Sequence, residues 1–240
     1  MLPEEERVAW PFYIVCDVSE SMHKPYAKQN SELTPYEAMQ EALHELVDFC
    51  EDHLAVADIA HLGVLTFADE TDVAIPLRKM SDGVPVRQLP KGKYTNYANV
   101  FTTLSEVVAA DISELESRYQ KLKRPAVFFI TDGMPVVDGE SQPTESWLGP
   151  LRRLHALTAA RQGKEDVRIA VVALGFAGAN CENLRLVAQA PGIACVAEAG
   201  IASLHELMVS LIESIFVSMV DSAAGGDLVY TPPPGMKLCE

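Results

Sequence analysis

Basic side chains are scarce in this sequence. Its 240 residues include 19 Lys and Arg against 34 Asp and Glu, which gives a formal net charge of −15 at pH 7. Proteins that bind nucleic acids or anionic membranes draw much of their affinity from clustered Lys and Arg side chains. The composition therefore argues against both partners, and we expect no nucleic-acid binding and no membrane binding.

Paired cysteine motifs are also missing. The five cysteines include no Cys-x-x-Cys pair, and their odd number argues against a disulfide framework or a zinc ribbon. The first ten residues, MLPEEERVAW, are acidic where a secretory signal would be basic, and no signal-type apolar segment follows them. These features predict a cytoplasmic protein whose thiols are reduced.

Two further absences narrow the function. The sequence has neither a Gly-x-Gly-x-x-Gly motif nor a Walker loop, which argues against nucleotide binding. Its best candidate for a membrane span, residues 201–220, is interrupted by His205, Glu206 and Glu213, and its apolar residues recur at helical spacing. This segment is predicted to be a packed helix rather than a membrane span.

Apolar strands alternate with amphipathic helices along the chain. Continuous apolar runs predict strands at 12–17, 59–67, 126–131 and 167–176, with shorter strands at 73–77 and 193–196. Helical spacing predicts helices at 34–52, 96–122, 182–189 and 201–220, and another helix that follows the loop at 134–143 and ends near 161. This order is typical of an α/β fold with a doubly wound, mostly parallel sheet, helices on both faces and one antiparallel edge strand from the hairpin at 59–77.

The length of the chain suits one large domain. We place this domain at residues 1–220. Residues 221–240 form a Gly- and Pro-rich C-terminal tail, which is expected to be either loose or laid along the domain.

Oxygen-bearing side chains follow the ends of two of the predicted strands. Asp17 ends the first strand, Ser19 and Ser21 follow it at intervals of two, Thr95 precedes a predicted helix, and Asp132 follows the strand at 126–131. Ligands of doubly wound sheets collect at the carboxyl ends of the strands. Oxygen ligation with only two carboxylates suits Mg²⁺, which keeps several waters when it binds to proteins. The sequence therefore predicts a Mg²⁺ site formed by these five residues, with Mn²⁺ or Ca²⁺ as alternative ions.

Other interpretations of these residues stay open. Asp and Ser are common in turns that end strands, and Thr is common near helix caps. Asp17 with the distal Asp132 also suits a Mg²⁺-dependent phosphohydrolase in which Asp17 is the nucleophile. Phosphatases of that type place a second Asp two positions on, where this sequence has Ser19. We therefore favour a non-enzymatic binding module and assign no catalytic residue.

The sequence resembles the von Willebrand factor A (VWA) domain with its metal-ion-dependent adhesion site. Three motifs carry the resemblance, in an order and spacing that agree over most of residues 10–220: Asp17-x-Ser19-x-Ser21 after the first strand, Thr95 in TyrThrAsn before a helix, and Thr131-Asp132-Gly133 after a central strand. The resemblance implies a VWA/Rossmann-like fold and direct ligation by the three hydroxyls, with the two carboxylates bound directly or through water. It also implies a protein partner that supplies an Asp or Glu to the metal.

Within that family, ThrAspGlyMetPro and the nearby Trp147 look most similar to a bacterial cytoplasmic group associated with tellurite resistance. The similarity implies a scaffold in a stress-response signalling assembly, with a phosphatase or kinase of the same system as a candidate partner. The loop LysGlyLysTyrThrAsn departs from the usual Gly-Gly-Thr loop. Its Lys91 and Lys93 are expected to place positive charge near the metal, which either favours an acidic partner or weakens the affinity for the cation.

Overall fold

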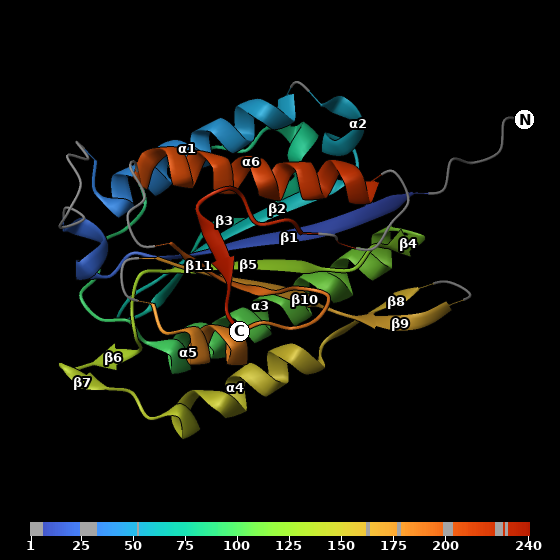
Figure 1. Cartoon of the computed structure of the whole chain (residues 1–240). Coiled ribbons are helices and arrows are strands. Elements are labelled where there is room, and N and C mark those ends of the chain that lie inside the picture. The colour runs from blue at the N-terminus through green and yellow to red at the C-terminus, as the bar shows by residue number, and fades with distance from the viewer. Residues whose placement is uncertain are drawn as a thin grey trace, which may run out of the picture.

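The computed structural model describes residues 7–24, 33–51, 53–161, 164–176, 179–198, 204–223, 228 and 230–240. Its centre is a single eight-stranded sheet (Figure 1). The strands of this sheet are β1 (Val8–Asp17), β2 (Ala60–Phe67), β3 (Thr71–Lys79), β4 (Lys121–Leu122), β5 (Ala126–Thr131), β10 (Ala170–Gly175), β11 (Ala194–Ala197) and β12 (Met236–Leu238). Their order is β12-β11-β10-β5-β1-β2-β3, and the short β4 pairs with β1.

Helices cover both faces of the sheet, as Figure 1 shows. One face carries α1 (Pro35–Glu51), α2 (Leu54–Ala57) and α6 (Leu204–Ala223), and the other carries α3 (Tyr97–Arg118), α4 (Thr144–Ala156) and α5 (Cys181–Val187). Two short 3-10 helices, η1 (Glu20–His23) and η2 (Met80–Asp82), lie in the connections. The predicted doubly wound, mostly parallel fold with helices on both faces is therefore confirmed.

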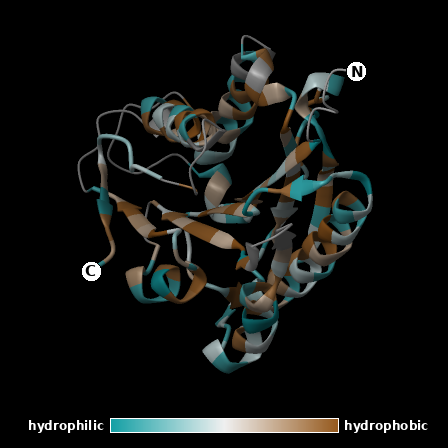
Figure 2. Cartoon of the chain, turned by 90° about the vertical axis from the view of Figure 1, so that its right-hand side faces the viewer, coloured by the Kyte–Doolittle hydropathy of each residue, from teal (hydrophilic) through white to brown (hydrophobic). Residues whose placement is uncertain are grey.

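The two layers have separate hydrophobic cores because successive residues of a strand point to opposite faces. In β1, Phe12, Ile14 and Cys16 face the core under α1 and α6, whereas Tyr13 and Val15 face the core under α3 and α4. Figure 2 shows the hydrophobic residues gathered on the strands and on the adjoining sides of the helices. Asp17 follows Val15 by two positions, so the alternation places it on the α3 side of the sheet.

The helix starts follow the expected capping chemistry. The backbone N–H of Thr34 donates to Glu37 Oε2 at 2.8 Å, and the N–H of Glu37 donates to Thr34 Oγ1 at 3.3 Å, which is a capping box at the start of α1. The side chain of Asn96 accepts from the N–H of Asn99 at 3.1 Å at the start of α3. The α3 cap fixes where the chain turns from the loop that contains Thr95 into the helix.

The predicted antiparallel edge strand is confirmed at β3, which pairs with β2. The C-terminal tail supplies another antiparallel edge strand, because β12 pairs with β11 at the opposite edge. Leu228 and Tyr230 are also buried, so these parts of the tail lie along the domain. The helix predicted to end at 220 is α6, which continues to Ala223.

Two predicted helix ends and one predicted strand are wrong. The helix predicted to end near 161 ends at Ala156, and the following residues form β8 (Thr158–Arg161), which pairs with β9 (Lys164–Arg168). The strand predicted at 167–176 is thus split between β9 and β10. The helix predicted to reach 122 stops at Arg118, and β4 begins at Lys121. In both cases apolar residues continue past the helix end, so periodicity does not mark the point where strand pairing takes over.

The prediction that all thiols are reduced is wrong for one pair. Cys181 and Cys239 form a disulfide, with their Cα atoms 5.2 Å apart and a sequence separation of 58. The pair meets because β12 returns to β11, which contacts α5. Cys16 and Cys195 are free and buried.

A membrane span was not expected. Across the described part of the chain, no helix combines the length and the apolar character that crossing a bilayer requires.

Candidate metal centre

Asp17 and Asp132 lie at the carboxyl ends of two neighbouring strands. β1 and β5 are parallel and paired, with Cys16 beside Ile130 in the register. Asp17 therefore ends its strand next to Thr131, whose hydroxyl donates a hydrogen bond to Asp17 Oδ2 at 2.7 Å. Asp132 follows directly. The expectation that parallel strands bring the two carboxylates to one edge of the sheet is met.

The two serines connect these carboxylates. The backbone N–H of Ser19 donates to Asp17 Oδ1 at 2.9 Å, and Ser19 Oγ lies 3.1 Å from Ser21 Oγ. Ser21 Oγ donates to Asp132 Oδ1 at 2.8 Å. The bond from Ser19 to Asp17 has the form of a strand-ending Asx turn. The turn interpretation and the metal-site interpretation therefore describe the same segment, since the turn is what folds the serines back toward Asp132.

Thr95 reaches the same place from a loop. Its backbone forms two hydrogen bonds with Val136, at 2.9 and 3.0 Å. A Cβ atom built on Gly133 would lie 3.9 Å from Thr95 Oγ1 and 4.0 Å from Ser21 Oγ, so both hydroxyls line the space beside this glycine. All five residues predicted from the sequence are thus brought together at one edge of the sheet.

Burial gives the site its electrostatic character. The side chains of Asp17 and Asp132 are 0% and 6% exposed. Burial, together with the charge of Asp132, raises the pKa of Asp17 to about 7, and burial also raises the pKa of Asp132. Among the described residues, neither carboxylate forms an ion pair with Lys or Arg. The two buried carboxylates therefore lie next to each other without a paired cation from the described residues. A divalent cation would be the natural counter-charge at this site.

The donor set fits a hard divalent cation. It consists of carboxylate and hydroxyl oxygens, which are the ligands that Mg²⁺ and Ca²⁺ prefer. Within the ranges that the structure describes, no cluster of three or more His, Cys, Asp and Glu side chains is arranged to hold a metal. A transition-metal site of the usual His and Cys type is therefore not found there, and the hydroxyls would have to complete the coordination.

Three neighbouring residues that we did not assign to the site support its geometry. Thr131 accepts the N–H of Gly133 at 3.2 Å while it donates to Asp17. Tyr97 is buried, and its hydroxyl lies 3.5 Å from Gly133 O. Gly92 packs directly on the Cβ of Ala68, where a larger side chain would overlap. Thr131 could have been found from its place beside Asp132 in the Thr-Asp-Gly motif, whereas no sequence signal marks Tyr97 or Gly92 as part of the site.

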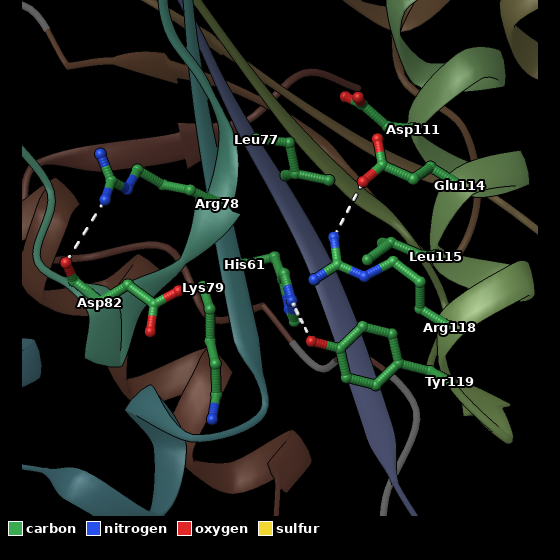
Figure 3. Close-up of a pocket in the computed structure, with 10 residues that line it drawn as sticks. All are labelled: His61, Leu77, Arg78, Lys79, Asp82, Asp111, Glu114, Leu115, Arg118 and Tyr119. Atoms are coloured by element: carbon green, nitrogen blue, oxygen red, sulfur yellow. Dashed lines mark hydrogen bonds and ion pairs between the residues drawn. The ribbon is translucent and has the colours of Figure 1, made fainter.

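A cavity lies at the end of the sheet opposite to the candidate metal centre, between β2, β3 and the last turns of α3 (Figure 3). Its volume is about 250 Å³. Its polar side chains bond to one another or to their surroundings, as three contacts illustrate: Arg118 to Glu114 at 2.8 Å, His61 to Tyr119 at 2.9 Å, and Lys79 to Asp58 at 3.1 Å. Lys79 and Arg118 are thus paired with carboxylates, and the cavity is separate from the candidate metal centre.

Similar solved structures share the fold across most of this chain. A von Willebrand factor type A protein from Catenulispora acidiphila has 15% identity and a TM-score of 0.59, over 89% of this chain and 42% of that chain. The pilus adhesin SpaC from Lactobacillus rhamnosus GG has 12% identity and a TM-score of 0.63, over 91% and 31%. Proximal thread matrix protein 1 from the mussel byssus, in a structure with a zinc-occupied MIDAS motif, has 19% identity and a TM-score of 0.52, over 90% and 49%.

This chain thus spans less than half the length of each of these three proteins. None of the curated proteins matches it. A family model described as the von Willebrand factor type A domain matches residues 12–134, which is more than half of the chain and includes all five residues of the candidate metal centre. The chain therefore belongs to the von Willebrand factor type A domain family.

Proposed function

We propose that this chain is a metal-dependent protein-binding module. Five residues would hold Mg²⁺, with Mn²⁺ or Ca²⁺ as alternatives: Asp17, Ser19, Ser21, Thr95 and Asp132. The observation that carries the proposal is the pair of buried carboxylates at the carboxyl edge of the sheet, which are joined through the backbone N–H of Ser19 and the hydroxyls of Ser19 and Ser21. A divalent cation would neutralise these carboxylates and, with neutral hydroxyls as its other ligands, would attract an Asp or Glu side chain of a protein partner.

A solved relative supports the choice of a divalent cation. The mussel byssus protein that shares this fold carries zinc in its MIDAS motif. Zinc and magnesium differ in preferred ligands, and a donor set made only of oxygens favours the harder ion. We therefore propose Mg²⁺ as the resident ion of this chain.

The geometry favours binding over catalysis. Asp17 is fully buried, and each of its carboxylate oxygens accepts a hydrogen bond, from Ser19 and from Thr131. A nucleophile must approach its substrate closely and needs an acid or base beside it, whereas the residue two positions on is Ser19. The alternative, a Mg²⁺-dependent phosphohydrolase with Asp17 as nucleophile, is therefore the weaker proposal.

The wider setting rests on the sequence resemblance. We propose a bacterial stress-response assembly of the tellurite-resistance type, with a phosphatase or kinase as the partner. Trp147, which contributed to this resemblance, is fully buried, with its ring 5.5 Å from that of Tyr97, so it supports the site from inside the core.

The cytoplasmic location stays a prediction, and the Cys181–Cys239 disulfide favours an oxidising compartment instead.

Calorimetric titration with Mg²⁺ tests the metal site. We expect the wild-type protein to bind the ion and Asp132→Ala to lose binding. Asp111→Ala is the matched control, because Asp111 is another carboxylate whose pKa is raised by burial, but it is half-buried and lies on α3 outside the site. Equal Mg²⁺ affinity in the wild type and in Asp132→Ala would contradict the proposed ligand set.

Capture from a cell extract in Mg²⁺ and in EDTA tests the binding role. Partner proteins identified by mass spectrometry are expected in Mg²⁺ and are lost in EDTA and in Asp17→Ala. Removing one member of a buried charge pair costs roughly 2 to 5 kcal/mol, which is about 30-fold to several thousand-fold in affinity. Metal-dependent turnover of an aryl phosphate that Asp17→Asn abolishes would instead establish the hydrolase alternative.

A further inference from the structure

Two lysines of the loop before Thr95 are exposed, and among the described residues neither has a carboxylate partner. Lys91 Nζ lies 5.0 Å from the centre of the Tyr36 ring, and Lys93 Nζ lies 4.7 Å from the centre of the Tyr94 ring. Neither lysine takes part in an ion pair in the part of the chain that the structure describes. The chain has 34 acidic residues and only 19 basic ones, so these two lysines form no ion pair with the described residues although acidic side chains are in excess.

The backbone fixes this loop against the candidate metal centre. The N–H of Gly92 donates to Val18 O at 3.0 Å, and the N–H of Glu20 donates to Lys93 O at 3.3 Å. Val18 and Glu20 are the residues that alternate with Asp17, Ser19 and Ser21 in the metal-site turn. The lysines are therefore carried by a segment that runs directly beside the turn and ends at Thr95.

Among the described residues, the acidic side chains that act on these lysines, Glu20, Glu37 and Asp69, have partners of their own. Glu20 forms an ion pair with Lys24 at 3.1 Å, and Glu37 accepts from Thr34 in the capping box at the start of α1. Asp69 Oδ2 accepts the backbone N–H of Lys93 at 2.6 Å. These acids are held by local contacts, and the ammonium groups of both lysines rest on aromatic rings, which orient them without neutralising their charge.

We propose that Lys91 and Lys93 form a second anchor for the partner protein, beside the metal. The partner is an acidic segment that carries at least two carboxylates, one directed to the metal and the others to the lysines. This inference rests on the proposed function, because it assumes that the first carboxylate is bound by the cation. Charge complementarity selects this occupant, because two lysines that form no ion pair with any described residue lie beside a site that itself attracts a carboxylate. Such charges increase both specificity and the rate of association.

Two synthetic peptides test the second anchor. One carries several aspartates separated by glycines, and the other is identical except that asparagine replaces all aspartates but one. Their affinities are measured by fluorescence anisotropy in saturating Mg²⁺, for the wild type and for Lys91→Glu/Lys93→Glu. Arg152→Glu/Arg153→Glu is the matched control, since it makes the same change in net charge at two exposed positions of α4.

We expect the wild type to bind the multi-aspartate peptide more tightly than the single-aspartate peptide. Exposed lysine–carboxylate pairs contribute modestly, so loss of two pairs is expected to weaken binding roughly 2- to 30-fold. Lys91→Glu/Lys93→Glu should abolish the difference between the peptides, and the control variant should keep it. Because exposed charges are screened, added salt should also shrink the difference in the wild type.

Mg²⁺ titration separates failure of this inference from failure of the proposed function. If the wild type binds Mg²⁺ but does not distinguish the two peptides, or if the lysine variant keeps the full difference, the second anchor is wrong and the metal site stands. If the wild type does not bind Mg²⁺, the proposed function itself is wrong. Unchanged Mg²⁺ affinity in the lysine variant, with loss of the peptide difference, supports the inference.

Discussion

Replacing Asp17 with asparagine removes the charge of a fully buried carboxylate while keeping its size and planar shape. In the wild type, burial and the neighbouring Asp132 raise the pKa of Asp17 from 3.8 to about 7. Since the pKa in the folded state lies above that in the unfolded state, the folded protein binds this proton more tightly. The stability that Asp17 contributes is therefore fully present below about pH 3.8 and is lost as the pH rises through about 7.

The rise in pKa sets the magnitude of the effect. One pKa unit corresponds to about 1.36 kcal/mol, so ionised Asp17 lowers the free energy of unfolding by up to about 4 kcal/mol when no metal is bound. Asp17→Asn should therefore stabilise the metal-free protein by up to about 4 kcal/mol near pH 8 and by much less near pH 4. Saturation with Mg²⁺ should shrink the advantage of the variant near pH 8 to roughly 1 kcal/mol, since an ion at about 100 times its Kd stabilises the wild type by about 2.7 kcal/mol and the variant loses this gain.

Urea unfolding of both proteins, with and without Mg²⁺ and at both pH values, measures these differences. Asp111→Asn serves as the control, because burial also raises the pKa of Asp111 while its contact is with Tyr13 rather than with the site. This control should respond to Mg²⁺ as the wild type does. The reasoning would be refuted if Asp17→Asn were less stable than the wild type in EDTA near pH 8. It would also be refuted if Mg²⁺ raised the free energy of unfolding of this variant as much as that of the wild type.

Two further predictions concern the parts that hold the site and the tail in place. The Cys181–Cys239 disulfide links positions that are 58 apart, so on the chain-entropy model its reduction should lower the free energy of unfolding by about 4 kcal/mol. Urea unfolding with and without a thiol reductant measures this loss. No change would mean that the tail is held in place without the bond. Gly92→Ala should cost roughly 1 to 3 kcal/mol and weaken Mg²⁺ binding, because its Cβ would overlap Ala68 and move the loop that carries Thr95. Gly149→Ala is the control, because Gly149 is an exposed helical position with open space around it, and the change should be neutral or stabilising by up to about 1 kcal/mol. If Gly149→Ala also lost Mg²⁺ affinity, the overlap with Ala68 would not be the cause of the loss in Gly92→Ala.

Most elements were predictable because their signals are local. The continuous apolar run before Asp17 gave β1, and the Thr34, Pro35 and Glu37 pattern gave the start of α1. The end of α4 was not predictable, because the residues that follow it, Thr158–Arg161, fit a helix or a strand equally well. Their pairing with β9 decides that they form a strand. The disulfide was missed for a similar reason, since the two cysteines are 58 positions apart in sequence and only the return of β12 brings them together.

The sequence by itself determined which residues stand at the ends of strands, and in a doubly wound sheet that is enough to place Asp17 and Asp132 at one edge. The tertiary structure decided what surrounds them. Burial raises the pKa of Asp17, Ser19 and Ser21 connect the two carboxylates, and Gly92 lets the lysine-bearing loop pack directly on Ala68 beyond the end of β2. Burial and close approach are properties of packing between segments that are distant in sequence, so no local pattern of residues encodes them.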